Sequence, residues 1–128
     1  MYCGLAFEAI CQKHVLQIKQ ALGIAGIQIE VGSWRYIATK GQKGAQIDLL
    51  PDRSNHCMNI CEIKFSVNEF VVDREVAEQI DYAVKTFREQ TKIKKTIFPT
   101  LITTKGAKQN IYYTGRIVSE ITMKELFR

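Results

Sequence analysis

Two short apolar stretches joined by a turn, within residues 44–65, constrain the fold of this chain more than any other feature. The first covers residues 45–50 and the second residues 58–65. Turn-forming residues stand between them, namely Pro51, Asp52, Ser54 and Asn55. Short apolar runs bounded in this way predict the two antiparallel strands of a β-hairpin.

Three charged side chains lie inside these otherwise apolar strands. Because alternate residues of a strand point to the same face, Gln46, Asp48 and Leu50 are expected on one face of the first strand. By the same rule Glu62 and Lys64 share a face of the second strand. An unpaired buried charge is costly, so we expect these charges to have partners or a function.

The chemistry that suits these residues is metal-assisted hydrolysis of a phosphodiester. Mg²⁺ (or Mn²⁺) binds carboxylate oxygens, which Asp48 and Glu62 would supply from adjacent strands. Lys64 would then orient the attacking water or offset charge on the phosphate. The alternative is a cross-strand salt bridge at the edge of a sheet, with no catalytic role.

The N-terminal residues 5–22 have the pattern of one amphipathic helix, ended by Gly23. Its apolar stripe consists of Phe7, Cys11, Val15, Ile18 and Leu22. Glu8 has the helical phase of that stripe and is therefore expected to point inward. It is either an acid favoured by the helix dipole or a third carboxylate of a site built on the sheet.

Aromatic and β-branched residues predict a further strand over residues 28–38, before a loop over residues 39–44. The loop carries Lys40 and Lys43 among glycines. Together with Arg53, these residues are candidates for contacts with a phosphate backbone. The alternative for the loop is a solvated, flexible segment.

After the hairpin, Asp73 is a good N-cap for a long helix, with Gln79 and Tyr82 beside its apolar stripe. Residues 95–104 predict another strand, and Pro99 within it favours an edge position or an interruption. Shorter strands are expected at residues 111–113 and 116–121. A capping-box pattern at residues 122–125 predicts a final short helix.

The chain of 128 residues has the length of one domain, and we expect a single domain over residues 1–128. Its formal net charge of +5 permits a polyanionic partner without requiring one. The sequence has no apolar run long enough for a membrane span, and its start does not have the pattern of a signal peptide. A cytoplasmic location is therefore expected.

The four cysteines are expected to be free thiols. They are Cys3, Cys11, Cys57 and Cys61. A zinc site made of His56, Cys57 and Cys61 is disfavoured, because a strand would hold the two thiols about 13 Å apart.

The expected order of elements is α, β, β, β, α, β, followed by a small β and α ending. This α/β arrangement, with a mixed central sheet flanked by helices, resembles the restriction-endonuclease-like αβββαβ core of the PD-(D/E)XK nuclease superfamily. The spacing from Asp48 to Glu62 and Lys64 also resembles that superfamily, with Ile47 standing where its leading proline often stands. The resemblance implies that Glu8 supports the metal and that Gln79 and Tyr82 support the site.

The amino-acid sequence of residues 44–53 and 59–65 resembles, more narrowly, that of the C-terminal domain of archaeal-type AAA ATPases. In those proteins a P-loop ATPase module and a winged helix precede a nuclease-like domain. The resemblance implies a domain excised from a larger ATPase chain, with those modules as its partners.

Two functions follow as hypotheses from these observations. The first is a Mg²⁺-dependent endonuclease acting on DNA, of which a junction resolvase is a variant. The second is a non-catalytic module that keeps the fold for contacts with nucleic acid or protein. The sequence leaves open DNA or RNA as substrate, the specificity, and whether the chain is a monomer or a homodimer.

Overall fold

A computed structural model describes residues 2–39 and 41–127, with all their side chains except those of Tyr2 and Cys3. The predicted hairpin is present: β2 (Ala45–Arg53) and β3 (Cys57–Lys64) pair in antiparallel fashion. β2 is longer than expected, however, because Pro51 does not end it. Pro51 is opposite Val31 of the preceding strand, and the pairs recorded between β2 and β3 lie on either side of it. The turn falls on residues 54–56 instead.

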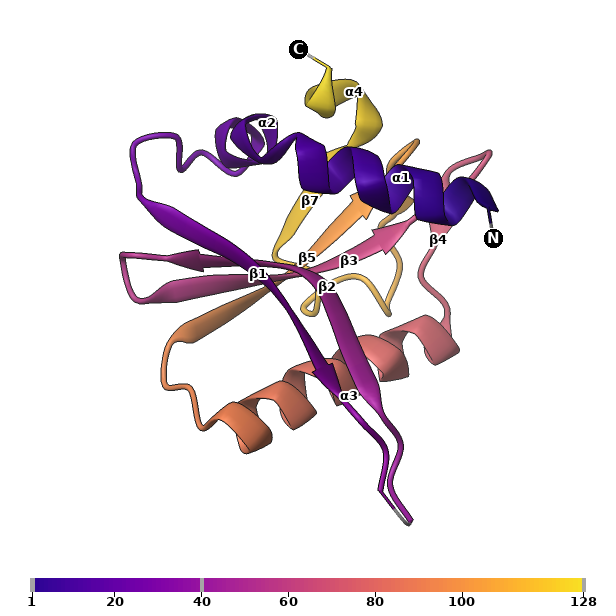
Figure 1. Ribbon diagram of the computed structural model, residues 1–128. Helices are drawn as coiled ribbons and strands as arrows, with labels where there is room; N and C mark the ends of the chain where they lie inside the picture. The colour runs from indigo at the N-terminus through magenta and orange to yellow at the C-terminus, as the bar shows by residue number, and fades with distance from the viewer. Residues whose placement is uncertain (1, 40, 128) are drawn as a thin grey trace.

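The hairpin lies inside a mixed five-stranded sheet of order β1-β2-β3-β5-β7 (Figure 1). The other strands of this sheet are β1 (Ile29–Tyr36), β5 (Thr96–Thr103) and β7 (Ser119–Thr122). β1 is antiparallel to β2, whereas β5 is parallel to both β3 and β7. A small second sheet pairs β4 (Phe70–Val71) with β6 (Ala107–Lys108).

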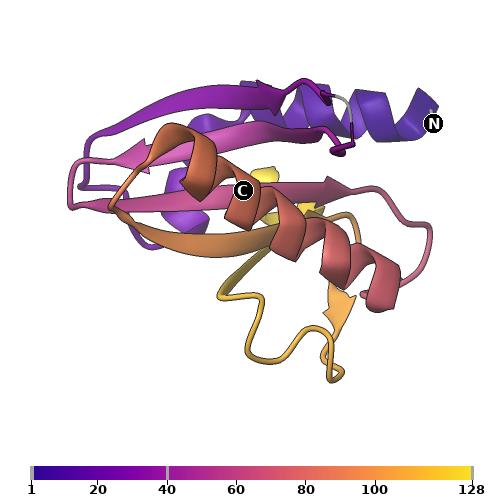
Figure 2. The same ribbon diagram turned by 90° about the horizontal axis from the view of Figure 1, so that it is seen from below.

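Helices cover both faces of the large sheet. α1 (Tyr2–Lys13), α2 (Val15–Ala21) and α4 (Met123–Leu126) lie on one face, and α3 (Arg74–Thr91) crosses the other (Figures 1 and 2). α3 is the crossover that makes β5 parallel to β3. None of the helices in the described ranges is both long enough and apolar enough to cross a membrane.

The single N-terminal helix predicted over residues 5–22 is two helices separated at His14. His14 has φ −118° and ψ 41°, and the Ile10 carbonyl accepts a hydrogen bond from its Nδ1 (2.7 Å). The inward face survives the break, because Phe7, Cys11 and Ile18 join the same buried cluster. The apolar period therefore predicted the buried face correctly, but not the change of direction.

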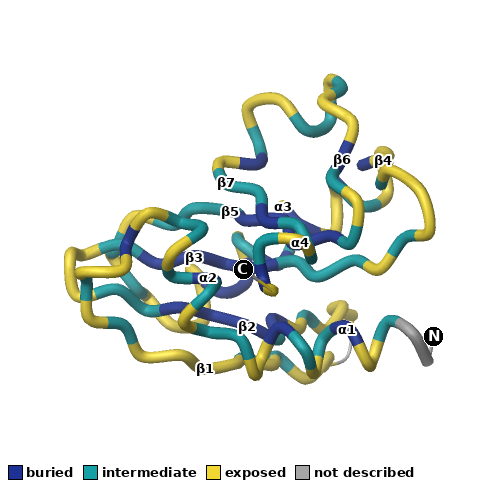
Figure 3. Tube along the Cα trace, turned by 90° about the horizontal axis from the view of Figure 1, so that it is seen from above, coloured by how far each residue is buried: buried dark blue, intermediate teal, exposed yellow. Residues whose placement is uncertain are grey.

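Buried residues fill both sides of the sheet, and β2, β3 and β5 hold the longest buried segments (Figure 3). Under α1 and α4 the core includes Leu49, Cys61 and Ile121. Under α3 it includes Ile47 and Leu50 of β2, together with Ala83 and Phe87 of the helix. A third cluster packs the start of α3 against β5 and the segment before β7.

The helix ends follow the local predictions. Asp73 Oδ1 accepts a hydrogen bond from Val76 N (2.9 Å), which makes Asp73 the N-cap of α3. Thr122 is the N-cap of α4, and its N–H donates to Glu125 Oε1 (3.1 Å). Both signals act within one turn of the chain, which is why sequence alone predicts them.

Pro99 is not at an edge, because β5 lies between β3 and β7. The Pro99 carbonyl accepts from Val118 N (2.9 Å), just before β7 begins at Ser119. The N–H that proline lacks would point to this same side, before β7 has begun. An internal strand can therefore hold a proline at this position without losing a hydrogen bond.

The strand predicted at residues 111–113 is wrong. Asn110 Oδ1 accepts from the N–H groups of Tyr112 and Tyr113 (3.0 Å each), and these hydrogen bonds form a turn. Residues 111–116 are all turn, and of residues 116–121 only the part from Ser119 onward is strand.

Candidate functional site

The candidate site lies where β2 and β3 separate, which we call the fork. Leu49–Cys61 is the pair of β2 and β3 nearest to this end, and continuing its register places Asp48 opposite Glu62. Beyond the Leu49–Cys61 pair, residues 45–47 pair with β1 and residues 62–64 pair with β5, rather than with each other. Figure 1 shows β2 bending away from β3 at this point, with α1 on one side and α3 on the other. The two carboxylates therefore lie where β2 and β3 separate.

A β-bulge in β2 places Asp48 at this position. Gly32 and Trp34 of β1 are separated by one residue, but their partners Leu50 and Ile47 are separated by two, so β2 carries an extra residue. Ile47 and Leu50 consequently face α3 together, whereas Leu49 faces α1. The expectation that Leu50 shares the face of Asp48 is wrong for this reason.

Glu8 reaches the fork from α1. Its carboxyl hydrogen-bonds to that of Asp48, and the charges of Glu62 and Lys64 also act on it. Burial, the hydrogen bond to Asp48 and the negative charges of Asp48 and Glu62 together raise the pKa of Glu8 to about 7. The helix phase thus predicted correctly that Glu8 points to the sheet, and the four residues predicted to lie together do so.

Glu62 and Lys64 form an ion pair on the β3 arm of the fork. Lys64 Nζ lies 3.3 Å from Glu62 Oε1, and both side chains are somewhat less than one-third exposed. Burial raises the pKa of Glu62, with a further rise from Asp48, although the Lys64 charge acts in the opposite direction. The ammonium of Lys64 therefore partly offsets the cost of burying the Glu62 carboxylate.

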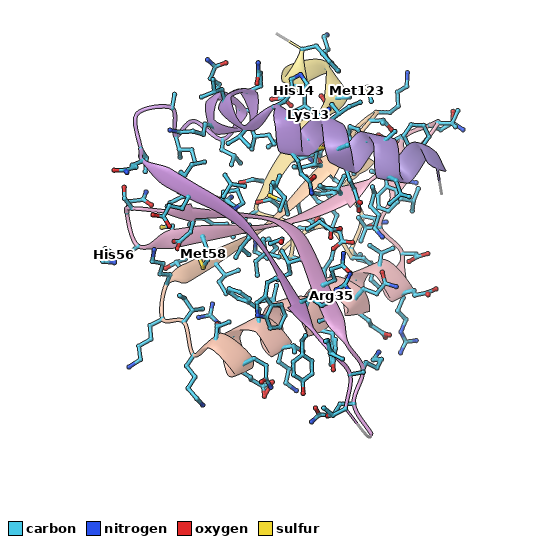
Figure 4. The ribbon with its side chains drawn as sticks, viewed as in Figure 1. Lys13, His14, Arg35, His56, Met58 and Met123 are labelled. Atoms are coloured by element: carbon cyan, nitrogen blue, oxygen red, sulfur yellow. The ribbon has the colours of Figure 1, made fainter. Side chains whose placement is uncertain are left out.

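Gln46 and Arg35 are functional candidates that the sequence reasoning did not identify as such. The Gln46 amide nitrogen donates to Asp48 Oδ1, while its Oε1 accepts from Arg35 Nη2 (2.9 Å). Arg35 is the register partner of Gln46 on β1 (labelled in Figure 4). This chain of hydrogen bonds orients the Asp48 carboxylate. The strand alternation that put Gln46 beside Asp48 was the available signal, but nothing in the sequence identified Arg35.

A pocket of about 340 Å³ opens beside the fork, between β2, β3 and α3. Glu62 and Gln46 line it from the sheet, and Gln79 and Tyr82 line it from the helix. The Tyr82 hydroxyl donates to the Lys43 carbonyl (2.6 Å), which fastens the loop before β2 to α3. Gln79 and Tyr82 therefore lie at the site, as predicted, and Lys43 lies at its rim.

Arg53 is not part of this group. It ends β2 five residues beyond Asp48, which is about 16 Å at the rise of a strand. Its guanidinium lies 5.4 Å from the centre of the Phe98 ring and donates to Asn59 Oδ1 (3.4 Å). His56, in the turn beyond it, lies at the far left of the view in Figure 4, away from Arg35. Lys40 lies outside the described residues.

Two of the three cysteine side chains that the structure describes lie in the core, and the third lies near a turn. Cys11, Cys57 and Cys61 are free thiols, and the Cys3 side chain lies outside the described part. Cys11 and Cys61 are buried in the cluster under α1, whereas Cys57 starts β3 near the turn. Burial raises the pKa of Cys11 to about 12 and also raises the pKa of Cys61.

The donor set at the fork fits a hard divalent cation. Among the described residues, no group of three or more His, Cys, Asp or Glu side chains is arranged to hold a metal ion as it stands. Mg²⁺ needs only one or two protein carboxylates, however, which Asp48 and Glu62 would supply. Burial first, and the neighbouring carboxylates second, raise the pKa values of Glu8 and Glu62, and a bound cation would offset both effects.

The structure thus brings Glu8, Asp48, Glu62 and Lys64 together and places Gln79 and Tyr82 beside them. Their catalytic and metal-binding roles stay predictions. Comparison of the chain with protein-family models, with curated proteins and with solved structures gives no match.

Proposed function

We propose that this chain is a metal-dependent endonuclease-like domain that hydrolyses DNA phosphodiester bonds. The observation that carries the proposal is the fork, where Asp48 and Glu62 occupy facing positions just past the last β2–β3 pair. Glu8 and Lys64 add a third carboxyl and a cation at the same place. Stabilising the fold does not require this concentration of charge, since each of these groups carries a desolvation cost.

Asp48 and Glu62 would hold the metal, with Glu8 completing the carboxylate set. Mg²⁺ or Mn²⁺ bound there would polarise the phosphodiester and lower the pKa of a bound water. Lys64 is two residues from Glu62 on the same strand face and contributes no metal ligand. Its ammonium would orient the attacking water or offset the charge that develops on the phosphate.

Gln46 and Arg35 would act as positioning residues for Asp48. The Gln46 amide donates to Asp48 Oδ1 and so fixes the orientation of the carboxylate that would bind the metal. The Arg35 guanidinium fixes the orientation of that amide by donating to its oxygen. Outer partners of this kind typically contribute about 10- to 100-fold to metal affinity or activity.

The fold supports the assignment to the PD-(D/E)XK nucleases. The order α1, β1, β2, β3, α3, β5, with β3 and β5 parallel, is the order expected for the αβββαβ core. A split helix at the start and the additional β4, β6, β7 and α4 do not disturb it. The proposal includes the parent architecture, in which ATPase and winged-helix modules of an archaeal-type AAA ATPase precede this domain.

DNA cleavage by the parent protein and by Lys64→Ala tests the proposal. With Mg²⁺ or Mn²⁺, the unsubstituted domain, here called the parent, is expected to cleave supercoiled or branched DNA. It is expected to cleave none when a chelator removes the metal. Lys64→Ala is expected to lose about 10²- to 10³-fold in rate while still binding Mn²⁺, because Lys64 is not a ligand. Asp48→Asn is expected to lose both activity and Mn²⁺ binding, as measured by calorimetry.

Lys108→Ala is the matched control, since Lys108 is an exposed lysine on β6, outside the fork. It should cleave as the parent does. Equal rates for the parent and Lys64→Ala, or no cleavage by the parent even when joined to its ATPase, would contradict the nuclease and favour the non-catalytic module.

A further inference from the structure

A second polar pocket, of about 370 Å³, adjoins the pocket at the fork. Its walls are the end of β1, the loop before β2 and the C-terminal half of α3. Lys43 and Tyr82 line both pockets, so the second begins where the first ends. The residues on which its chemistry depends are Tyr36, Gln42, Lys43, Tyr82, Lys85 and Glu89.

We propose that this pocket is a nucleotide subsite, which holds the single-stranded nucleotide next to the phosphodiester that is cleaved. The inference rests on the proposed function, because it takes the fork as the place where the bond breaks. A strand leaving the fork past the shared residues would enter this pocket directly. The volume is at the small end of ligand sites and suits one nucleotide rather than a duplex.

Two lysines offer the charge for a phosphate. Lys43 and Lys85 approach the pocket from the loop and from α3 respectively. Lys43 Nζ lies 5.1 Å from the centre of the Tyr82 ring, which keeps the ammonium beside the helix. Because the Tyr82 hydroxyl also binds the Lys43 backbone, loop and helix are joined before any ligand arrives. Phosphate contacts of this kind position a strand without reading its sequence.

Gln42 offers donors for a base or a phosphate oxygen. Its Oε1 accepts from the Tyr36 hydroxyl (2.5 Å) and from Thr39 Oγ1 (3.2 Å). With its carbonyl oxygen held in this way, the amide nitrogen keeps its two N–H donors for a ligand. Glu89, one helical turn after Lys85, offers acceptor oxygens of the kind that take the amino group of cytosine.

Binding of single-stranded DNA in the presence of chelator tests the subsite apart from catalysis. The probe is a fluorescein-labelled oligonucleotide of about ten nucleotides and mixed sequence, followed by anisotropy at several salt concentrations. Lys85→Gln is expected to weaken binding several-fold and to reduce the slope of log affinity against log salt by about 0.7. Gln42→Glu, which puts a negative charge in the pocket, is expected to weaken binding as well.

Lys108→Gln is the control, because it removes the same charge from an exposed lysine on β6 that does not line the pocket. It should keep the parent's affinity and slope. Binding that is equal in Lys85→Gln, Gln42→Glu and Lys108→Gln overturns the subsite. If the nuclease proposal is wrong instead, the result differs: the parent cleaves no DNA with Mg²⁺ or Mn²⁺, while Lys85→Gln still binds single-stranded DNA more weakly than the parent.

Discussion

The Glu8 carboxyl lies at the fork although its surroundings there disfavour the ionised form. An ionised Glu8 would lie beside Asp48 and near Glu62, so burial and these neighbours favour its protonated form and raise its pKa to about 7. In the unfolded chain the pKa of a glutamate is about 4.3. The folded state therefore binds more protons than the unfolded state between these two pH values, and the contribution of Glu8 to stability falls as pH rises through them.

Glu8→Gln should consequently stabilise the protein at pH 8 and have little effect near pH 4, in chelator. Because Glu8 is partly exposed and solvent screens its interactions, the gain at pH 8 is expected to be about 1 kcal/mol. Thermal unfolding at both pH values measures it. Glu69→Gln, an exposed carboxylate on the loop before β4, is the control. The same change in Tm at both pH values would show that Glu8 does not carry a raised pKa.

At the scale of elements, the ends of helices were predictable and the places of strands were less so. The cap at Asp73 depends on a hydrogen bond spanning three residues, which sequence contains in full. The position of β5 depends instead on β3 and β7, which lie far from it in the chain, and for that reason Pro99 misled the prediction. Asn110 was a local signal for a turn. The apolar residues after it suggested a strand instead, and the prediction followed them.

Asp73→Ala should destabilise the protein by about 1 kcal/mol, because the N–H of Val76 loses its acceptor at the start of α3. Urea denaturation followed by circular dichroism measures the loss. Asp73→Asn keeps an oxygen acceptor and is expected to cost much less. An equal loss in the two variants would attribute the effect to the charge on the helix dipole rather than to the cap.

At the scale of the whole molecule, the core beneath α1 links the N-terminal helix to the strand that carries Glu62. Cys11 of α1 and Cys61 of β3 are both buried in this cluster, with 0% and 3% of their surface exposed. Their thiols have raised pKa values because of that burial. Access to either thiol requires α1 to leave the sheet, which would also remove Glu8 from the fork.

Alkylation at pH 8 should therefore label Cys57 well before Cys11 or Cys61 in the native protein. The measurement is site-resolved mass spectrometry on a Cys3→Ser background. Labelling of Cys11 and Cys61 is expected to follow global unfolding, so it should accelerate with urea as the unfolded fraction grows. Labelling of Cys61 as fast as Cys57 in buffer would contradict the buried core described for α1 and β3.

The sequence by itself determined the hairpin, the caps of α3 and α4, and the inward phase of Glu8. These depend on strand alternation, helix phase and hydrogen bonds within a turn, all of which are short-range. The tertiary structure decided the break at His14, the bulge beside Asp48, the hydrogen bond of Arg35 to Gln46 and the separation of Arg53 from the fork. The last three depend on which strands pair and where that pairing stops, a choice made by packing between residues distant in the chain.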